Sequence, residues 1–463
     1  MTAKTIPHVA SGLPPIRGLR LEVVEGPSAG LTQSFSKDSV SIGTAIGNDL
    51  VIEDPKVSRY HVELGRVGDR ISVRDLGSTN GTWLGGVRLK DVEAPPRTEL
   101  RLGESRVRIE DAGTVEIELL DDESLGRFRG RTPEARRLMA LMQKAAKSDV
   151  PVLVLGETGT GKEVIARTIH EHSARARGPL ETVDCGALMP TLVASELFGH
   201  ERGAFTGADR QHVGAFERAH GGTLFLDEIG ELPSSLQPAL LGVLERKSFR
   251  RLGGTKQIPV DVRVVAATHR DLRTEVNAGT FRQDLYFRLA VIVLKVPGLR
   301  ERAGDLPILV EHFLREAGHS VSATDLFTPE MWAQMRTYRW PGNVRELRNF
   351  VDAAMALGEA PELERDEHLP STPKPQKSTK SSEPEEARRP ENRDESRAFP
   401  SEPLESLIQL EYKDARQKIL DEFERLYLAS VLERAENNIT LAAQRARIHR
   451  TYLIQMLKRH NLR

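Results

Sequence analysis

The chain has 463 residues, enough for about three domains of ordinary size. Acidic and basic residues nearly balance, at a formal net charge of −1, so any basic surface for nucleic acid must be local. The single cysteine, Cys185, excludes an internal disulfide framework and suits a reducing compartment. No apolar run approaches the roughly 18–20 residues that span a bilayer, and residues 1–11 lack the apolar core of a signal peptide. We therefore expect a cytoplasmic protein with no membrane part.

After a tail of residues 1–16, residues 17–112 show the pattern of an all-β sandwich. Short runs of alternating apolar and polar residues are separated by turn residues such as Asn80-Gly81. We expect strands near residues 19–24, 40–43, 61–64, 71–73 and 106–109.

Four short motifs stand out in this segment: Ser39-Val40-Ser41-Ile42-Gly43, Asn48-Asp49, Val57-Ser58-Arg59-Tyr60-His61 and Asp75-Leu76-Gly77-Ser78-Thr79-Asn80-Gly81-Thr82. Together they resemble a forkhead-associated (FHA) domain, a sandwich that binds phosphothreonine peptides through loops at one end. The resemblance implies that a phosphopeptide is bound by Ser58 and Arg59 at its phosphate and by Ser78, Thr79 and Asn80 elsewhere. The lone His61 is expected to brace these loops rather than to bind a ligand.

One position departs from the FHA pattern, because Thr44 follows Gly43 where the family has an arginine. That arginine pairs with the phosphate through a fork of charged donors, which a threonine hydroxyl cannot replace. Two hypotheses stay open for the sandwich. Either it binds phosphothreonine, or it is kept for contact with a protein and depends weakly or not at all on phosphate.

Residues 113–125 are rich in Asp and Glu and are expected to be a linker. Residues 126–147 then carry Leu138, Leu141, Met142 and Ala145 at helical spacing, which indicates an amphipathic helix.

A glycine-rich loop lies between the apolar run 152–155 and the apolar start of a helix at 164–166. Strand, glycine loop and helix is the context of a phosphate-binding P-loop. Glycines let backbone N–H groups converge on phosphates, the helix N-terminus adds a positive dipole, and the lysine reaches the β- and γ-phosphates. We expect a nucleotide to be bound by Gly156, Glu157, Thr158, Gly159, Thr160, Gly161, Lys162 and Glu163.

A second apolar run ends in two carboxylates, Asp227 and Glu228. Beside a P-loop strand this is a Walker B motif, in which Asp227 holds Mg²⁺ through water and Glu228 orients and deprotonates the attacking water. An ordinary solvated strand end is disfavoured by the P-loop upstream. A third buried run, residues 264–270, also has a polar end at Thr268 and His269.

Between the P-loop and the carboxylates lies a glycine-rich segment, which we expect to be a mobile contact loop with an exposed aromatic side chain. Its residues are Gly203, Ala204, Phe205, Thr206, Gly207 and Ala208. This GAFTGA string resembles that of the bacterial enhancer-binding proteins, the AAA+ activators of sigma-54 RNA polymerase. The resemblance covers residues 126–358 and implies a separate α/β domain there, with a parallel sheet and a helical lid. It also implies ATP and Mg²⁺ as cofactors, a homo-oligomer between a dimer and a hexameric ring, and contact of this loop with sigma-54.

The same resemblance implies roles for further residues. Thr268 and His269 match sensor I, and Arg345 in the lid matches sensor II. Arg282 and Arg288 match arginine fingers that reach a neighbouring subunit's γ-phosphate. An arginine supplied in trans can contribute on the order of 10³–10⁵ in rate.

Two positions of the ATPase segment depart from common sequence patterns. Glu163 stands where Ser or Thr usually binds Mg²⁺ in a P-loop, and the enhancer-binding proteins share this glutamate. Asp184 stands where that family often has an Asn that pairs with the catalytic glutamate, and two like charges oppose such a pairing.

Residues 359–403 are mainly Pro, Ser, Lys, Glu and Arg and are expected to be a disordered linker. Residues 404–463 return to an amphipathic pattern and have no acidic residue after Glu436. This end resembles a Fis-type helix-turn-helix domain, although Arg447 stands where a turn glycine is usual. The resemblance implies an all-α domain that contacts DNA through Arg450, Thr451, Tyr452, Gln455 and Lys458.

The leading hypothesis is a multidomain sigma-54-dependent transcription activator. It would bind upstream DNA, hydrolyse ATP and receive its input from a phosphothreonine protein or a Ser/Thr kinase. One rival is an AAA+ chaperone, which would need neither the GAFTGA loop nor a helix-turn-helix. A second rival is a DNA-binding regulator with a vestigial ATPase, which the intact Lys162, Asp227 and Glu228 disfavour.

Overall fold

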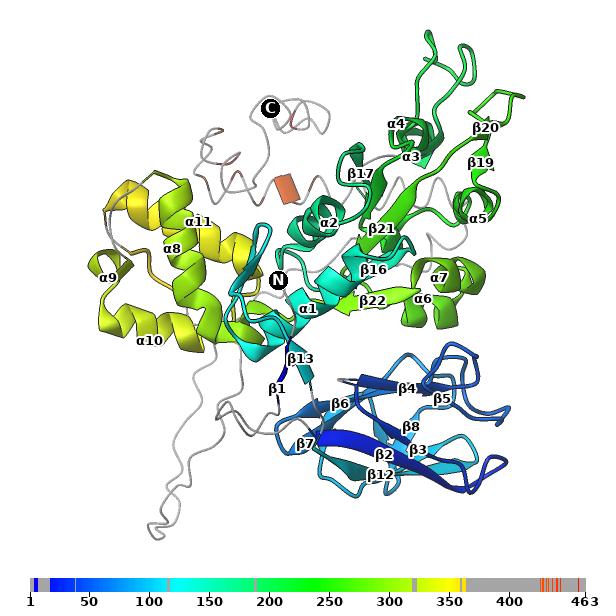
Figure 1. Cartoon of the computed structure of the whole chain (residues 1–463), viewed down its shortest axis with the longest axis vertical. Helices are drawn as coiled ribbons and strands as arrows, with labels where there is room; N and C mark the ends of the chain where they lie inside the picture. Colours follow the sequence, from blue (N-terminus) through cyan, green and yellow to red (C-terminus); the bar gives the residue numbers. More distant parts are fainter. Residues whose placement is uncertain are drawn as a thin grey trace, which may run out of the picture. The chain divides into compact units, whose positions relative to one another are not determined.

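The computed structural model describes residues 4–6, 17–37, 39–114, 117–186, 190–318, 323–358 and 360–363, together with single positions between 425 and 457. The chain divides into two compact units, Met1–Leu369 and Pro370–Arg463. Most of the predicted 359–403 linker and all five residues predicted to contact DNA lie outside the described residues. Figure 1 labels the elements of the first unit.

The N-terminal part is the predicted β-sandwich (Figure 1). One sheet has the strand order β10 (Asp91–Ala94), β7 (Arg70–Asp75), β6 (Val62–Val67), β4 (Ser39–Gly43) and β5 (Leu50–Val51). The other has the order β3 (Thr32–Phe35), β2 (Arg17–Glu25), β12 (Ser105–Thr114), β11 (Glu99–Leu102), β8 (Thr82–Leu84) and β9 (Val87–Leu89). Neighbouring strands are antiparallel except β4 and β5.

The two sheets enclose one apolar core. Alternate residues of each strand face inward, such as Leu19, Leu21 and Val23 on β2, which are 0% exposed. They pack with inward residues of the facing sheet, including Val62 and Leu64 on β6. The sandwich therefore has a core of its own, and its loops are held by fixed strand ends.

The expected linker at 113–125 contains β-structure. Strand β12 ends only at Thr114, β13 (Ile117–Leu119) pairs with β1 (Lys4–Ile6), and β14 (Ser124–Leu125) pairs with β15 (Phe128–Arg129). Apolar residues interrupt the acidic run, and Leu120 and Leu125 are 1% and 3% exposed. They pack against α1 (Pro133–Ala146), the predicted amphipathic helix, so the segment is fixed to the following domain.

The central domain is built on a sheet of five parallel strands, as predicted. Their order is β17 (Leu180–Asp184), β18 (Thr223–Asp227), β21 (Arg263–Thr268), β16 (Val152–Leu155) and β22 (Ile292–Lys295). All six residues of β21 are buried, which identifies it as the centre of the core. The helices besides α1 are α2 (Lys162–Glu171), α3 (Pro190–Phe198), α4 (Ala215–Arg218), α5 (Gln237–Arg246), α6 (Leu272–Ala278) and α7 (Gln283–Leu289).

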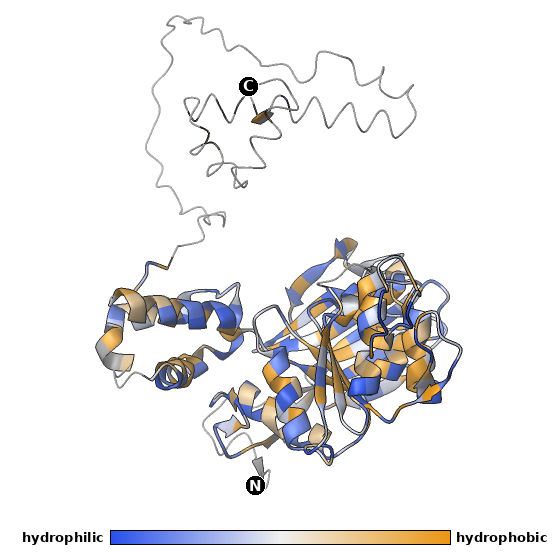
Figure 2. Ribbon diagram, turned by 90° about the horizontal axis from the view of Figure 1, so that it is seen from above, coloured by the Kyte–Doolittle hydropathy of each residue, from blue (hydrophilic) through white to orange (hydrophobic). Residues whose placement is uncertain are grey.

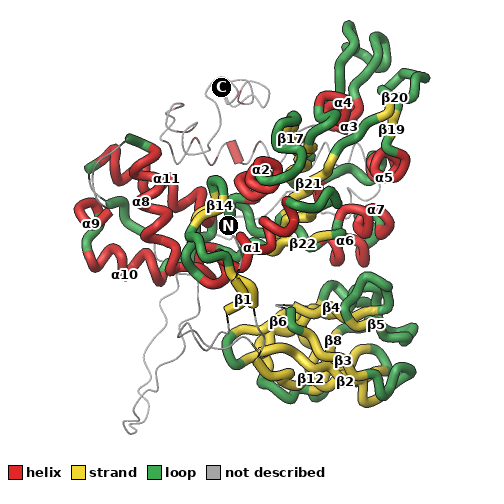
Figure 3. The backbone as a smooth tube through the Cα atoms, viewed as in Figure 1, coloured by secondary structure: helices red, strands yellow, loops and turns green. Residues whose placement is uncertain are grey.

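A helical lid follows the sheet. It consists of the 3₁₀ segment Leu299–Asp305 and the helices α8 (Leu306–Glu316), α9 (Ala323–Leu326), α10 (Pro329–Thr337) and α11 (Asn343–Leu357). Figure 3 distinguishes this helical lid from the strand-rich sandwich, and Figure 2 shows hydrophobic and hydrophilic residues alternating along the lid helices. Trp340 is 0% exposed and packs edge-to-face on Phe350, which closes the lid's separate core.

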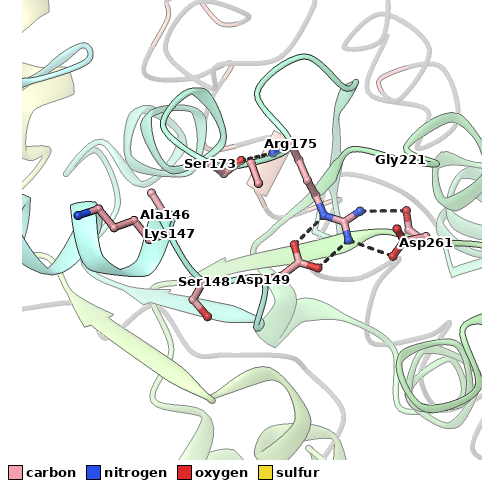
Figure 4. A pocket seen from close by; sticks show the side chains of 9 residues that line it. Ala146, Lys147, Ser148, Asp149, Ser173, Arg175, Gly221 and Asp261 are labelled. Carbon is pink, nitrogen blue, oxygen red and sulfur yellow. Dashed lines mark hydrogen bonds and ion pairs between the residues drawn. The ribbon is translucent and has the colours of Figure 1, made fainter.

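A pocket lies where strands of the central sheet begin, at the edge opposite the P-loop (Figure 4). Arg175 spans it, donating from Nε and Nη2 to Asp149 at 2.6 and 2.7 Å and from Nη2 to Asp261 at 3.0 Å. These hydrogen bonds hold the pKa values of both carboxyls below their usual range. Because Arg175 links the segments that precede β16 and β21, we infer that the residues of this pocket stabilise the fold.

Candidate functional site

The P-loop connects β16 to α2 and has the backbone that phosphate binding needs. Gly159 and Gly161 have φ of +81° and +98°, values that residues with a side chain rarely adopt. A Cβ on Gly159 would lie 2.1 Å from the carbonyl oxygen of Gly342 in the lid. Gly161 is the N-cap of α2 and has no side chain to cap the helix, which leaves N–H groups at the helix start to bind an anion.

Lys162 joins the P-loop to the Walker B carboxylates. Its side chain is 7% exposed, and its ammonium donates to the carbonyl oxygen of Gly156 at 3.1 Å. The same ammonium lies 3.2 Å from Oε1 of Glu228. The strands that end at Leu155 and at Asp227 thus bring together two groups that lie far apart in the sequence.

Glu228 is held from two sides. Its second oxygen, Oε2, lies 2.7 Å from Nδ1 of His269 and accepts from the His269 backbone N–H at 3.2 Å. Its φ of +48° fixes the sharp turn after β18. Although burial opposes ionisation, the bonds from His269 and the charge of Lys162 lower the pKa of Glu228. A carboxylate that is ionised and oriented is suited to act as a base.

Asp227 lies beside Glu228 in a different environment. Its Oδ1 accepts from the Glu228 backbone N–H at 3.0 Å. Burial, together with the charges of Glu228 and Asp184, raises its pKa. A divalent cation would relieve that repulsion, so the donor chemistry fits Mg²⁺ held by one carboxylate, water and nucleotide phosphates.

Thr268 and Asp184 end the neighbouring strands of the same sheet. Thr268 is 0% exposed and its Oγ1 accepts from the Arg270 N–H at 3.1 Å. Asp184 lies opposite Asp227 in the strand register, and its Oδ1 accepts from the Gly186 N–H at 2.8 Å. The described partners of the Glu228 carboxylate are Lys162 and His269. The sequence placed His269 at this strand end but did not predict its bond to Glu228.

The lid reaches the P-loop through Glu157. Arg300 donates from Nη1 and Nη2 to the two oxygens of Glu157 at 2.8 and 2.5 Å. Asn343 Nδ2 donates to Glu157 Oε2 and to the Thr158 carbonyl, both at 3.1 Å. The bonds from Arg300 are the main cause that lowers the pKa of Glu157 to about 2. Neither Arg300 nor Asn343 was predicted from the sequence as a partner of the P-loop.

The remaining predicted residues of the nucleotide site lie around this centre. Thr160 Oγ1 donates to the Glu157 carbonyl at 2.7 Å, which tightens the loop. Arg345 is exposed at the start of α11, and its backbone N–H donates to the Gly159 carbonyl at 3.2 Å. Glu163 is exposed in the first turn of α2 and pairs with Arg167 at 3.8 Å.

The two predicted arginine fingers lie on α7. Arg282 is the N-cap residue of this helix and pairs with Asp284 through Nε at 3.0 Å and Nη2 at 2.7 Å. Arg288 is in the last turn and donates to the Leu244 carbonyl of α5 at 3.3 Å. Both side chains are exposed, so the surface of α7 presents them outward.

The GAFTGA loop follows α3 and is stapled at its base. The Gly203 N–H donates to the Ala208 carbonyl at 2.8 Å. Gly207 has a φ of +97°, which a residue without a Cβ adopts easily, and this lets the chain turn back at the end of the loop. At its foot, Arg251 binds Glu201 and Glu217. Thr206 is exposed, but Phe205 is half-buried and packs on His200 with ring centroids 4.9 Å apart. The aromatic side chain that we expected to be exposed is thus only partly so.

The five predicted phosphopeptide residues come from two adjacent loops of the sandwich. Ser58 Oγ accepts from the Thr79 N–H at 3.0 Å, and Asn80 Nδ2 donates to the Lys56 carbonyl at 2.8 Å. Ser78 is buried and bonds Asp75, whereas Arg59 turns to the central domain.

His61 braces these loops, as expected. Its Nδ1 accepts from the Ser58 N–H at 3.0 Å and its Nε2 lies 3.2 Å from the Gly81 carbonyl. Burial lowers the pKa of the imidazole, which favours a neutral ring in this place.

Comparison with known proteins agrees with this geometry. Residues 128–295 match the sigma-54 interaction domain, and residues 300–386 match the AAA+ ATPase lid domain. The central part of the chain therefore belongs to the family of sigma-54 interaction domains with an AAA+ lid. Residues 128–295 are accordingly an ATPase domain of the AAA+ class. Residues 22–122 match the cytoplasmic domain of an inner-membrane component of type III secretion systems.

Curated relatives share the central domain. The transcriptional regulatory protein ZraR of Escherichia coli K12 is 50% identical over 229 residues, 49% of this chain and 52% of that protein. The Nif-specific regulatory protein of Azotobacter vinelandii is 48% identical over 237 residues, 51% of this chain and 45% of that protein. The chain thus spans about half the length of these relatives.

Two of the similar solved structures cover different shares of the chain. NtrX from Brucella abortus in complex with ATP is 32% identical, covers 73% of this chain and 70% of that chain, and has a TM-score of 0.47. A phosphothreonine-dependent FHA domain is 26% identical, covers 20% of this chain and 95% of that chain, and has a TM-score of 0.19. In the described residues no helix is long and apolar enough to cross a membrane.

The contact between His269 and Glu228 predicts a change in pH dependence. A depressed carboxyl pKa keeps the base ionised until the pH falls through that pKa, so activity is lost on the acid side. His269→Ala removes a donor, raises the pKa of Glu228 and should move the acid limb of the ATPase pH profile to higher pH. His269→Asn keeps a donor and should shift the limb less. An unchanged acid limb in His269→Ala would show that this contact does not set the base.

Proposed function

We propose that this protein is a sigma-54-dependent transcription activator that hydrolyses ATP as a ring and remodels sigma-54 RNA polymerase through residues 203–208. The observation that carries the proposal is the combination, on one domain, of a stapled GAFTGA loop and a nucleotide site with Lys162 and Glu228 in contact. A vestigial ATPase would have no need of this ordered base. A general chaperone would have no need of this loop.

The residues divide the chemistry among themselves. Lys162 and the N-terminus of α2 bind the β- and γ-phosphates. Asp227 would hold Mg²⁺, which supplies charge neutralisation on those phosphates. Glu228 orients the attacking water and accepts its proton, while His269 keeps the carboxylate ionised and in place. Thr268 and Arg345 report on the phosphates from the sheet and from the lid.

A short path links hydrolysis to the GAFTGA loop. The Cys185 N–H donates to the Asp227 carbonyl at 2.9 Å, so the end of β17 is tied to the Walker B turn. From there the chain leads to α3, whose Ser195 Oγ lies 2.7 Å from Nδ1 of His200 at the foot of the loop. We propose that a shift of the Walker B turn on hydrolysis moves α3 and, through it, residues 203–208.

The active form is proposed to be a homo-oligomeric ring. Arg282 and Arg288 are exposed on α7, and their described hydrogen bonds go to Asp284 and to the Leu244 carbonyl. Exposed arginines in this position can contact the γ-phosphate of ATP bound to a neighbouring subunit. There an arginine stabilises the negative charge of the transition state.

The flanking parts would supply input and address. The loop cluster of Ser58, Arg59, Ser78, Thr79 and Asn80 supports a phosphothreonine protein, or a Ser/Thr kinase, as the partner of the sandwich. The basic C-terminal segment would bind upstream DNA through a helix-turn-helix fold. A protein with DNA and RNA polymerase as partners would work in the cytoplasm.

Thr206→Ala tests the role of the loop. Thr206 is exposed, and the substitution leaves the staple between Gly203 and Ala208 in place. We expect normal ATPase activity and loss of promoter opening by sigma-54 holoenzyme in a transcription assay. Glu228→Gln is the matched control, expected to bind ATP but to lose about 10²-fold or more of the hydrolysis rate. Promoter opening by Thr206→Ala at the native level would refute the loop's role.

Thr44→Arg tests phosphate recognition by the sandwich. Restoring the missing guanidinium adds a bidentate, charge-assisted contact, so affinity for phosphothreonine peptides should rise on the order of tenfold or more. Calorimetry of the full chain with phosphorylated and unphosphorylated peptides would measure it. Binding of neither peptide by either form would rule out phosphothreonine as the input.

A further inference from the structure

The loop face of the sandwich is packed against the ATPase domain. Ala45, Tyr60 and Leu76 are at most 7% exposed and belong to the core cluster of the central domain. Tyr60 meets Tyr286 of α7 edge-to-face, with ring centroids 5.5 Å apart. These residues lie within or next to the loops that carry the predicted phosphopeptide residues.

The backbone of these loops is bound by Asn277 of α6. Its Oδ1 accepts from the Tyr60 N–H at 3.4 Å, and its Nδ2 donates to the carbonyls of Tyr60 and Leu76, the latter at 2.9 Å. A single side-chain amide thus binds both loops, as the edge of a bound peptide would. Arg59 adds a bond from Nη2 to the Val276 carbonyl in the last turn of α6, at 2.8 Å, where a cation also interacts favourably with the helix dipole.

Ion pairs close the contact beside these loops. Glu63 on β6 is paired with Arg273 of α6, at 3.2 Å, and with Lys295 of β22. Glu63 and Arg273 are only 11% and 10% exposed. Although burial opposes ionisation, Arg273 and Lys295 lower the pKa of Glu63 to about 2. Arg273 also pairs with Asp271 at 2.8 Å, so neutralising Glu63 would remove both ion pairs across the contact while the Arg273 charge stays compensated.

We propose that the helix pair α6–α7 is an internal ligand of the sandwich's loop face, and that a phosphothreonine peptide displaces it by taking Arg59. Among the five residues predicted to bind the peptide, Arg59 is the only cation, because Thr44 stands where a second arginine would be. Of these five residues, Arg59 is therefore the one whose charge a phosphate would engage, and its guanidinium now bonds the Val276 carbonyl.

Displacement would change what the ATPase domain offers to a neighbour. Helix α7 carries Arg282 at its start and Arg288 in its last turn, and Tyr286 between them contacts the sandwich. A Cβ on Gly47 of the sandwich would lie 2.2 Å from the ring of Phe287, so the two surfaces are in direct contact there. The docked sandwich thus contacts α7 between its two exposed arginines, and in a ring it would restrict the approach of a neighbouring subunit to this helix. The peptide would clear it for ring assembly.

The test uses the full chain with Glu63→Gln and Asn277→Ala, each predicted to loosen the contact. Glu93→Gln is the control, since Glu93 forms an exposed pair with Arg70 on an outer strand of the same sheet. Hydrogen exchange is followed in residues 272–289 and 57–62. A degenerate phosphothreonine peptide pool and its unphosphorylated counterpart are titrated, and ring assembly is followed by sedimentation.

We expect faster hydrogen exchange in both loosened variants and ring assembly at lower protein concentration. Their affinity for the phosphorylated peptides should be higher on the order of tenfold, since each lost hydrogen bond is worth a factor of roughly 2–10. Glu93→Gln should behave as the native chain. The phosphorylated pool alone should speed exchange of residues 272–289 in the native chain.

Two outcomes would overturn the proposal, and they differ from a failure of the proposed function on which it rests. Native-like exchange in both loosened variants would mean that the docked contact does not hold in solution. Equal peptide affinity in native and loosened chains, with no change of exchange in α6, would exclude competition. If neither the native chain nor the variants bind the phosphorylated pool, the proposed phosphothreonine sensing is refuted, and so is competition between a peptide and α6–α7. The exchange data would still show whether the sandwich docks on these helices.

Discussion

The parallel arrangement of the central sheet is the constraint on which the nucleotide site depends. Because β16, β18 and β21 run in the same direction, the P-loop, the Walker B carboxylates and the Thr268–His269 corner emerge at one edge. All six residues of β21 are buried, so a one-residue slip would exchange the side chains that face the two sides of the sheet and disrupt their close packing. The contacts of Lys162 and His269 with Glu228 are consequences of that register.

The site is also connected outward in two directions. Glu157 ties the P-loop to Arg300 and Asn343 of the lid, so movement of the lid and of the phosphate-binding loop are coupled. On the other side, Cys185 ties the Walker B turn to the segment before α3. The proposed mechanism uses both links, because hydrolysis at the sheet edge must be transmitted to segments that can move, namely the lid and α3.

The sequence predicted those parts whose chemistry is local. Lys162 and Glu228 lie in short motifs in which residue spacing alone indicates the function. The alternation of apolar and polar residues in short runs predicted the sandwich. Contacts between distant residues were not predictable, since no local pattern links Glu157 to Arg300 or Arg59 to Val276. The acidic composition of residues 113–125 led us to predict a linker, although this segment contains leucines that pack on α1. The domain boundaries and the residue roles remain predictions.

Subunit mixing would test the central claim most directly, namely that one subunit's arginine completes another subunit's site. Lys162→Ala and Arg288→Ala are each expected to be inactive as ATPases. Mixed together, they should recover a measurable fraction of the native rate, because some sites then join an intact Lys162 to an intact neighbouring Arg288. Mixing either with native protein verifies that subunits exchange. A mixture that exchanges subunits and stays inactive would contradict the account.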